Sequence, residues 1–384
     1  MRILIVSKCP THPTTAGNRW VILAQVEKLR KMGHEVHFLY IEERGLRCSG
    51  DENNVDLDET RKFWGEYFHF FRVSKVEKLR MDIIKIIRKY FFSFHYSVDD
   101  QYPRGIEKIV KKLDIKYHFE ICIINYYYLS RLFRYVRIPK KVLFTHDAFA
   151  YKNIKVGEST FCITASSEAK AMQRCPHIFA LQEVEADYFH VISPHSLIYN
   201  IYGSFEYHPQ SVVGNHNIVF LSGNNAFNQN GLRWFLDNVF PVIKKSFADV
   251  RLLIGGSICR NMSELNEKNG VELQGYVENV GAFYAQADVC INPCYQGTGL
   301  KIKSFEAISY DKVTIVHPHS IEGIFDKVHA PLFASDQPEE WVNFLKKIWG
   351  NTSKIKDVKI RNRQYIDNLE FFINNEYDRF LKNK

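Results

Sequence analysis

Short apolar runs alternate with amphipathic stretches from the first residues of the chain onward. The run RILIVS at residues 2–7 is followed by GNRWVILAQVEKLRKMGHEV, in which apolar residues recur at roughly helical spacing up to Gly33. Gly33 stands where a helix C-terminal cap belongs, and EVHFLYI at residues 35–41 is the next strand-like run. Strand, helix and strand with short connections predict the βαβ unit of a parallel sheet.

The same alternation continues along the chain and is interrupted once, by the polar stretch YHPQSVVGNHN at residues 207–217. Further strand-like runs lie at residues 119–125, 141–147, 177–183, 196–202, 217–223, 250–256, 271–277, 288–293 and 313–318. We therefore predict an α/β chain with two doubly wound Rossmann-like domains facing a cleft, in which ligands bind at the carboxyl ends of the strands. The predicted parts are an N-terminal domain (1–206), a linker (207–216), a C-terminal domain (217–365) and a C-terminal helix packing back toward the N-terminal domain (366–384).

Composition limits the class of protein. The 384 residues suit two domains of ordinary size, and 46% hydrophobic with 24% charged residues is typical of a globular chain. No apolar run reaches the roughly 18 residues that a transmembrane helix needs, and the opening MRILIVSKCP is too short for a signal peptide. The formal charge of +8 does not by itself choose between nucleic acid, an anionic membrane and phosphorylated ligands.

The eight cysteines are scattered rather than arranged as a disulfide framework. We interpret them as reduced thiols of a cytoplasmic protein. Cys290 and Cys294 form the closest pair, but no second pair or histidine cluster joins them, so no zinc site is predicted. Neither a metal nor a resident cofactor is expected.

Residues 49–115 fit the alternation less well. Within them, residues 73–94 read VSKVEKLRMDIIKIIRKYFFSF, a basic amphipathic pattern that ends in aromatic residues. Such a helix could lie on an anionic membrane surface. The alternative is an ordinary surface helix with a solvated basic face.

The stretch GTGLKIKSFEA at residues 297–307 combines features that point to a phosphate-bearing ligand. Gly297 and Gly299 fall in a loop that feeds a helix N-terminus, where free backbone N–H groups and the helix dipole attract anions. Lys301 and Lys303 add positive charge at an end where lysine disfavours the helix itself. Glu306, about one turn further on, could accept hydrogen bonds from two ribose hydroxyls. The plain alternative is a tight turn with solvated lysines.

The stretch resembles the donor-binding motif of GT-B glycosyltransferases, in particular the retaining family numbered four. The similarity extends to the segments LQGYVENVGAFYAQADVCINP and GTGLKIKSFEAISYDKVTIVHPHSIEGI, and it is strong over residues 217–325. It implies a site for a nucleotide-diphosphate sugar, with Tyr276 and Val277 at the base and Asn224 at the phosphate or sugar. The donor-binding residues that it implies in the motif are Gly297, Thr298, Gly299, Leu300, Lys301, Lys303 and Glu306.

This chain departs from the family pattern in the donor domain. Thr298 stands near the position of a second family glutamate, and the usual arginine and lysine are missing from residues 222–230. Neutralisation of the diphosphate would then depend on Lys301 and Lys303.

The N-terminal half carries the acceptor-side candidates in LFTHDAF and FALQEVEADYF. His146 and Asp147 follow a strand, and the resemblance places His146 beside the transferred sugar with Asp147 holding its imidazole. A buried histidine and a helix-capping aspartate would give the same sequence. Glu183 and the neighbouring Glu185 follow another strand, where solvated charges are also common. Acceptor-side residues near the N-terminus are Gly17, Asn18 and Arg19, with a salt bridge as the alternative for Arg19.

The predicted function is therefore transfer of a sugar from a nucleotide-diphosphate sugar to a glycan or lipid-linked saccharide in bacterial cell-surface polysaccharide synthesis. The resemblance implies retention of configuration and no metal. The predicted location is the cytoplasm, with a peripheral position at the inner face of the membrane, and no nucleic-acid partner is expected. Two alternatives stay open: an epimerase that acts on a nucleotide sugar, and an inactive GT-B-like binding or scaffold protein.

Overall fold

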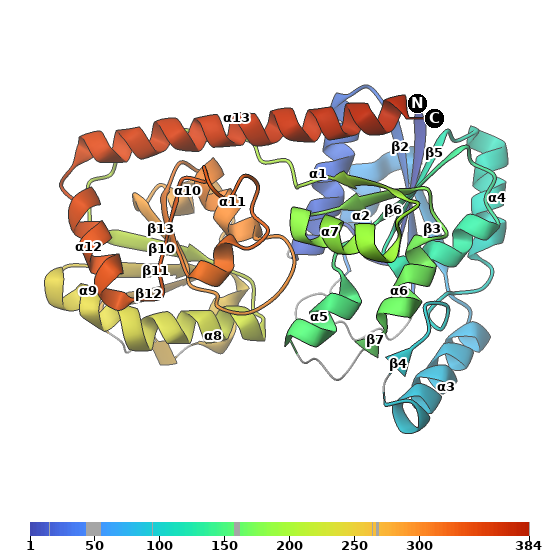
Figure 1. Cartoon of the computed structure of the whole chain (residues 1–384), viewed down its shortest axis with the longest axis horizontal. Helices are drawn as coiled ribbons and strands as arrows, with labels where there is room; N and C mark the ends of the chain where they lie inside the picture. Colours follow the sequence, from blue (N-terminus) through green and yellow to red (C-terminus); the bar gives the residue numbers. More distant parts are fainter. Residues whose placement is uncertain are drawn as a thin grey trace. The chain divides into compact units, whose positions relative to one another are not determined.

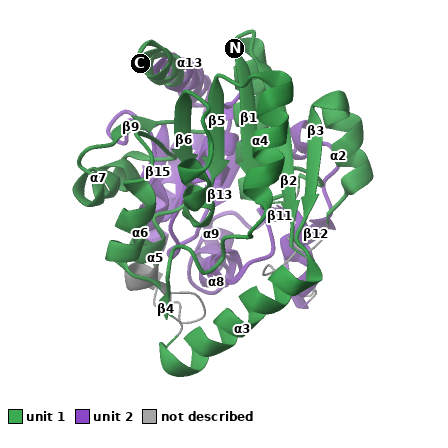
Figure 2. Ribbon diagram, turned by 90° about the vertical axis from the view of Figure 1, so that its right-hand side faces the viewer, with its two compact units in different colours: residues 1–203, 373–384 green, residues 204–372 purple. Residues whose placement is uncertain are grey.

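The computed structural model describes residues 1–14, 16–43, 55–93, 95–156, 162–262, 264–265 and 269–383. The chain divides into two compact units (Figure 2), unit 1 with residues 1–203 and 373–384 and unit 2 with residues 204–372. The predicted end of the N-terminal domain at residue 206 lies close to the end of the first segment of unit 1 at residue 203. The predicted linker at residues 207–216 and the predicted boundary at residue 365 both fall inside unit 2. Phe94, the last residue of the predicted membrane-surface stretch, lies outside the described residues.

Unit 1 is built on a seven-stranded parallel sheet with the order β3-β2-β1-β5-β6-β8-β9. Its strands are β1 (Arg2–Ser7), β2 (Glu35–Glu42), β3 (Phe68–Arg72), β5 (Ile121–Asn125), β6 (Lys140–Phe144), β8 (His177–Ala180) and β9 (Leu197–Asn200). A separate two-stranded parallel pair joins β4 (His95–Tyr96) and β7 (Cys162–Ile163). The order reverses between β1 and β5, which defines the topological switch point of the sheet.

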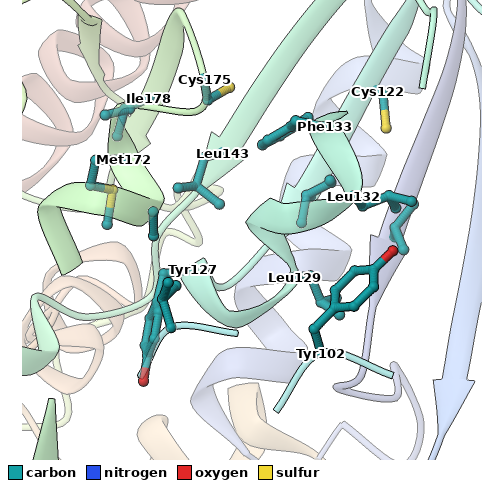
Figure 3. Packing of buried hydrophobic residues seen from close by; sticks show 14 of the residues in the cluster. Tyr102, Cys122, Tyr127, Leu129, Leu132, Phe133, Leu143, Met172, Cys175 and Ile178 are labelled. Carbon is teal, nitrogen blue, oxygen red and sulfur yellow. The ribbon is translucent and has the colours of Figure 1, made fainter. Parts of the chain in front are cut away.

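Helices connect these strands as the alternation predicts. They are α1 (Gly17–Lys31), α2 (Leu57–Trp64), α3 (Lys75–Phe91), α4 (Ile106–Tyr117), α5 (Phe149–Val156), α6 (Ala165–Met172) and α7 (Glu183–Ile192), with 3₁₀ segments at Gly65–Tyr67 and Tyr127–Arg134. Figure 3 shows part of the core, where Leu129, Leu132 and Phe133 lie in one buried cluster with Leu143 of β6. Burial on both faces explains why the central strands read as unbroken apolar runs.

Unit 2 is built on a six-stranded parallel sheet with the order β12-β11-β10-β13-β14-β15. Its strands are β10 (Asn217–Leu221), β11 (Arg251–Gly255), β12 (Val271–Gly275), β13 (Val289–Asn292), β14 (Val313–Val316) and β15 (Leu332–Ala334). Its helices are α8 (Ala226–Trp234), α9 (Phe240–Ser246), α10 (Val280–Tyr284), α11 (Ile302–Ser309) and α12 (Pro338–Ile348), with a π-helical turn at Phe235–Val239 and 3₁₀ segments at Ser257–Asn261 and Pro318–Ile321. The switch point of this sheet lies between β10 and β13.

Both faces of the unit 2 sheet are covered by helices. Ile218 and Phe220 of β10 point into a cluster with residues of α8, α9 and α12, whereas Val219 between them points into a second cluster with residues of α10 and α11. Figure 1 shows α8 and α9 on one side of the sheet and α10 and α11 on the other. This alternation is the period of two that a strand imposes on its side chains.

The long helix α13 (Thr352–Lys382) belongs to both units. Its last turns form part of unit 1, where Lys140 Nζ donates to the carbonyl of Phe380 at 2.9 Å and the backbone N–H of Asn200 donates to Glu376 at 2.7 Å. The Phe380 side chain is buried against Phe179 and Tyr199.

The predicted pair of doubly wound parallel-sheet domains is confirmed. Strand β3, within the stretch that fitted the alternation less well, was not predicted. It adds an edge strand beside β2, with residues that are only partly buried. None of the described helices has both the length and the apolar composition needed to span a membrane.

Candidate functional site

The switch point of unit 2 brings together two loops that follow neighbouring strands. One loop follows β10 at residues 222–225, and the other follows β13 at residues 293–301 and leads into α11. Because ligands of open parallel sheets bind beyond the carboxyl ends of the strands at this point, the motif at residues 297–307 lies where such a ligand would bind.

The loop after β13 depends on glycine conformation and on contacts from the next strand connection. Gly297 and Gly299 have φ angles of 106° and 82°, in the region that favours glycine. The carbonyl of Gly297 accepts a hydrogen bond from His319 Nε2 at 2.8 Å, and Ser320 Oγ donates to the carbonyl of Cys294 at 2.7 Å. His319 and Ser320 therefore fix the loop, and sequence reasoning did not identify either.

The first turn of α11 is positively charged. Lys301 directly precedes the helix, Lys303 lies within its first turn, and that turn contains no acidic residue. Lys301 Nζ lies 3.5 Å from His319 Nε2, beside the loop that His319 holds. The N-terminal end of a helix already carries partial positive charge, so the two lysines add to an environment that favours an anion. Thr298 lies between the two glycines and Leu300 directly precedes Lys301, and both side chains are partly buried.

Glu306 lies one turn into α11 and is partly buried. Burial raises the pKa of Glu306 to about 7, while the hydroxyl of Tyr284 and the charge of Lys303 act in the opposite direction. Tyr284 donates its hydroxyl to Glu306 Oε2 at 3.2 Å, and its ring stacks on Tyr310 at 4.8 Å between centroids. The carboxyl group is therefore oriented by an aromatic pair and titrates close to neutral pH.

The asparagine-rich loop after β10 is largely satisfied by its own hydrogen bonds. Asn225 caps α8 by accepting from the N–H of Asn228 at 2.9 Å, and Asn228 Nδ2 donates to the carbonyl of Gly223 at 2.8 Å. Asn224 accepts from Gln229 Nε2 at 2.6 Å, so its predicted contact with phosphate or sugar would have to compete with this bond. Cys294 Sγ lies 3.4 Å from Asn228 Oδ1 and links the loop after β13 to the first turn of α8.

Gly256 is the tightest point of this region, and we expect its replacement to destabilise unit 2. A Cβ at Gly256 would lie 2.3 Å from the carbonyl oxygen of Ser222, and its φ of +97° is unfavourable for other residues. Gly256→Ala should lower the free energy of unfolding by about 2–5 kcal/mol through the clash and the strained backbone. Gly223→Ala is the matched control, because a Cβ there meets nothing within 4 Å. Urea unfolding of both variants checks this, and equal stability of the two would contradict it.

The predicted base-contacting residues differ in exposure. Tyr276, which follows β12, is 76% exposed. Val277 packs against a buried cluster that includes Phe283 of α10. The Tyr276 ring is thus available to stack on a planar ligand, and Val277 fixes the loop that carries it.

A histidine and an asparagine are in contact at the carboxyl ends of β5 and β6, next to the switch point of unit 1. His146 follows β6 and Asn125 ends β5, and His146 Nε2 lies 2.6 Å from Asn125 Oδ1. Burial lowers the pKa of His146 to about 3, so the imidazole is neutral. Since Oδ1 only accepts, Nε2 carries the proton and Nδ1 is an acceptor. Nδ1 and the Asn125 amide nitrogen are buried and have no hydrogen-bond partner in the part of the chain that the structure describes.

The ring of Tyr126 supports this pair and connects it to α1. Tyr126 stacks on His146 with 4.3 Å between ring centroids, and its hydroxyl accepts from Asn18 Nδ2 at 3.1 Å. The predicted acceptor-side residue Asn18 therefore lies near His146 within the same unit. Sequence reasoning missed Asn125 and Tyr126, although an asparagine that closes the apolar run FEICIIN was a signal in the sequence.

The expected contact between Asp147 and the His146 imidazole is not what the structure shows. Asp147 instead forms an ion pair with Lys152 at 3.2 Å. The imidazole is positioned by Asn125 and Tyr126 because their side chains come from β5 and the residue after it, next to β6 in the sheet. The sequence neighbour of the histidine was thus the wrong partner.

The negative charge of Asp147 acts on two buried carboxyl groups, those of Glu168 and Glu185. Glu168 accepts from the backbone N–H groups of Phe149 and Ala150 and from Tyr188, and burial raises its pKa to about 7. Burial, together with the charge of Asp147, raises the pKa of Glu185 well above its usual range. Glu183, the predicted acceptor-side residue, is exposed at the first position of α7.

The remaining N-terminal candidates lie at the start of α1. Gly17 begins the helix and is exposed, and Arg19 is 1% exposed with its guanidinium donating to the carbonyl of Pro13 at 2.9 Å. The Arg19 side chain therefore holds the loop before α1. Across the described ranges, no three His, Cys, Asp or Glu side chains are grouped so that they could hold a metal ion.

The chain is similar to known proteins in sequence and in fold. Residues 215–351 match the family described as glycosyl transferases group 1. An uncharacterised 44.6 kDa protein in the cps region of Klebsiella pneumoniae is 23% identical over 331 residues, covering 80% of each chain.

Two solved structures cover nearly the whole chain. Sucrose-phosphate synthase from Thermosynechococcus elongatus superimposes with a TM-score of 0.68 at 13% identity, covering 100% of this chain and 98% of the other. The Anabaena protein HepE in complex with UDP and glucose gives a TM-score of 0.67 at 11% identity and covers 100% of both chains.

The chain has the GT-B fold, and residues 215–351 of its second unit match the group 1 glycosyl transferases. The protein is accordingly a glycosyltransferase, as the resemblance to GT-B glycosyltransferases implied. The narrower assignment to the retaining family numbered four stays a prediction.

Proposed function

We propose that the enzyme transfers a sugar from a nucleotide-diphosphate sugar to a glycan or lipid-linked saccharide in the synthesis of a bacterial cell-surface polysaccharide. The observation that carries the donor assignment is the arrangement at α11, where the Gly297–Gly299 loop, two lysines and Glu306 follow one another at the switch point. The solved complex of HepE with UDP and glucose, and the relative in a cps region, support the same class of reaction.

The donor residues have separate tasks in this proposal. The N-terminal end of α11 with Lys301 and Lys303 stabilises the negative charge that develops on the leaving diphosphate. Glu306 accepts hydrogen bonds from the ribose hydroxyls, and Tyr276 stacks on the base. Because lysines carry the charge in this scheme, we propose a metal-independent reaction, and an unchanged rate in EDTA is the expected result. Retention of configuration rests on the resemblance to family four.

Residues of unit 1 serve the sugar and acceptor in the same reaction. His146 presents a neutral acceptor nitrogen and Asn125 an amide donor, and a sugar hydroxyl is both a donor and an acceptor. We propose that a hydroxyl of the transferred sugar or of the acceptor binds to this pair. Asn18 and Glu183 complete the acceptor side, and the protein acts in the cytoplasm.

Thermal unfolding against a panel of UDP, GDP, ADP, TDP and CMP tests the donor site. A ligand that binds only the folded chain raises its stability in proportion to the logarithm of its concentration over Kd. One nucleotide should raise the Tm of the parent, and Lys301→Ala should reduce that rise. Lys346→Ala in α12 is the control, because Lys346 is an exposed lysine of the same unit away from the motif.

The outcomes separate the proposal from its two rivals. Stabilisation by none of the nucleotides would favour a binding or scaffold protein. When the stabilising nucleotide is known, the corresponding nucleotide sugar is incubated with the enzyme alone and with saccharide acceptors. A new sugar nucleotide formed from the donor alone would identify an epimerase, whereas product formed only with an acceptor supports transfer.

A further inference from the structure

Helix α3 of unit 1 exposes an apolar face. Figure 2 shows α3 at the periphery of the unit, apart from the main sheet. Seven apolar or aromatic side chains of this helix are between 42% and 80% exposed, and we refer to them as the α3 stripe. The α3 stripe consists of Val76, Leu79, Ile83, Ile86, Ile87, Tyr90 and Phe91.

The opposite side of the helix holds it on unit 1. Met81 is buried in the core of the unit. Glu77 accepts from Arg80 Nη2 at 2.6 Å and from the backbone N–H of Arg104 at 2.9 Å, and Arg88 pairs with Asp100 at 2.7 Å. The orientation of α3 is thus fixed by a buried methionine and ion pairs, while its most apolar side is left outside.

The spacing of the stripe defines one continuous helix face. Its members recur every three or four residues from Val76 to Phe91, which keeps them on one side of an α-helix over about four turns. Phe92, the residue after the helix, is 50% exposed and extends the aromatic end. Exposure of a continuous apolar face to water is unfavourable for a monomer, so the α3 stripe indicates a surface that binds a partner.

The charges beside the stripe indicate what that partner is. Helix α3 contains six basic and two acidic residues, a net charge of +4. Lys75, Lys78, Lys85 and Lys89 share one flank of the helix by their spacing, with Asp82 among them. Two copies of a face with this charge would repel each other, whereas a surface of anionic headgroups over hydrocarbon matches both the stripe and its flank.

We propose that the α3 stripe binds an anionic membrane surface. The apolar side chains enter the boundary between headgroups and acyl chains, and the lysines contact the headgroups. The solvated-helix alternative accounts for the lysines but not for seven exposed apolar side chains. The inference stands apart from the proposed function, since vesicle binding needs no substrate, but it brings unit 1 to the surface where a lipid-linked acceptor would be found.

Flotation of the full-length chain with phosphatidylglycerol-containing vesicles tests the inference, with pure phosphatidylcholine vesicles in parallel. The parent should float with the anionic vesicles. Leu79→Glu with Ile86→Glu should reduce the bound fraction at least tenfold, because charges replace two apolar side chains that enter the membrane boundary in the bound state. Lys75→Glu with Lys89→Glu should reduce binding to anionic vesicles about fivefold or more per lysine. Val191→Glu is the control, because Val191 of α7 is 78% exposed in the same unit.

The variants change exposed positions, so their folding is checked by Tm and by nucleotide binding. Loss of flotation in the two α3 variants with an unchanged Val191→Glu protein is the supporting result. A parent that stays with the unbound fraction at every lipid concentration would overturn the inference. The inference would also be overturned if the α3 stripe joined two copies of the chain instead. In that case the parent would sediment as a dimer and would not bind vesicles, and the Leu79→Glu, Ile86→Glu variant would sediment as a monomer.

Discussion

Replacing Glu306 with alanine is expected to reduce the affinity for the nucleotide-sugar donor by about 100-fold or more. Without the carboxylate, the bound donor would lose the two hydrogen bonds of its ribose hydroxyls. Each hydrogen bond to a charged group contributes about 1.5–3 kcal/mol. Glu306→Gln keeps one acceptor oxygen and should lose less, about tenfold. Titration calorimetry with the donor identified by the nucleotide panel measures both. Glu339→Gln, an exposed acid in the first turn of α12, is the control that should bind like the parent.

The same residue predicts how donor binding depends on pH. Burial raises the pKa of Glu306 to about 7, so the group is protonated below that pH and then offers a weaker acceptor to the ribose. Donor affinity should therefore increase from pH 6 to pH 8 in the parent and change little in Glu306→Gln. A nucleotide sugar is the right probe, because its diphosphate diester does not titrate in this range. An identical pH profile in parent and Glu306→Gln would show that the carboxylate does not bind the donor.

The stability of the folded chain has the opposite pH dependence. The pKa of Glu306 is higher in the folded chain than the value of 4.5 expected in the unfolded one, so the folded state binds the proton more tightly. The free energy of unfolding contributed by this group therefore decreases as pH rises from about 4.5 to about 7. Glu306→Gln should remove this dependence, which separates an effect on folding from one on the donor.

The fold was predictable because a parallel sheet covered by helices on both faces leaves a simple pattern of hydrophobic residues in the sequence. Strands such as residues 2–7 and 289–292 are apolar at nearly every position, and amphipathic helices separate them. Strand β3 escaped prediction because it lies at the sheet edge, where its residues Phe68–Arg72 are only partly buried and the apolar signal is weaker. Edge strands are defined by the neighbour they pair with, which the local sequence does not contain.

The donor motif was located from sequence because its residues are contiguous. Gly297, Lys301 and Glu306 lie within one loop and one helix, so their spacing alone places them at a helix N-terminus. His319 could not be found in this way, because it reaches Gly297 from the connection after β14. Contacts between the loops of neighbouring strands arise only when the strand order is known.

The acceptor-side prediction failed in one instructive respect. Asp147 was expected to hold His146 because it is adjacent in sequence, yet adjacent residues leaving a strand point in different directions. The partner of His146 is Asn125, which ends the adjacent strand β5 and whose side chain contacts the imidazole. For Arg19, predicted on the acceptor side with a salt bridge as the alternative, the structure shows a hydrogen bond to the Pro13 carbonyl. The partner of His146 follows from the strand order, which the local sequence does not contain.

Besides offering its amide N–H to a substrate hydroxyl, Asn125 positions the imidazole of His146 and sets its tautomer. A carboxylate partner would favour the imidazolium form, in which both ring nitrogens are donors. The amide instead binds the Nε2 proton without adding charge, and burial keeps the pKa of His146 near 3. Nδ1 is thereby kept as an acceptor throughout the physiological pH range.

Asn125→Asp is therefore expected to move the acid limit of activity to a higher pH. The new carboxylate should raise the pKa of His146 from about 3 by roughly 1–3 pH units. Nδ1 then becomes protonated below a limit that lies between about pH 4 and pH 6, so kcat/KM falls there while staying closer to the parent at pH 8. Asn125→Ala should lower kcat/KM about 10- to 100-fold at all pH values, because it leaves a buried N–H without its acceptor.

Selective ¹⁵N-histidine NMR provides a readout that does not depend on turnover. The parent should show His146 as the neutral Nε2–H tautomer, and Asn125→Asp should show an imidazolium that titrates near the new acid limit. Should Asn125→Asp leave both the tautomer and the pH profile unchanged, the asparagine would be a packing residue only. Should the tautomer change while turnover does not, His146 would be positioned as described but would lie outside the reaction, and the donor site in unit 2 would be unaffected by that result.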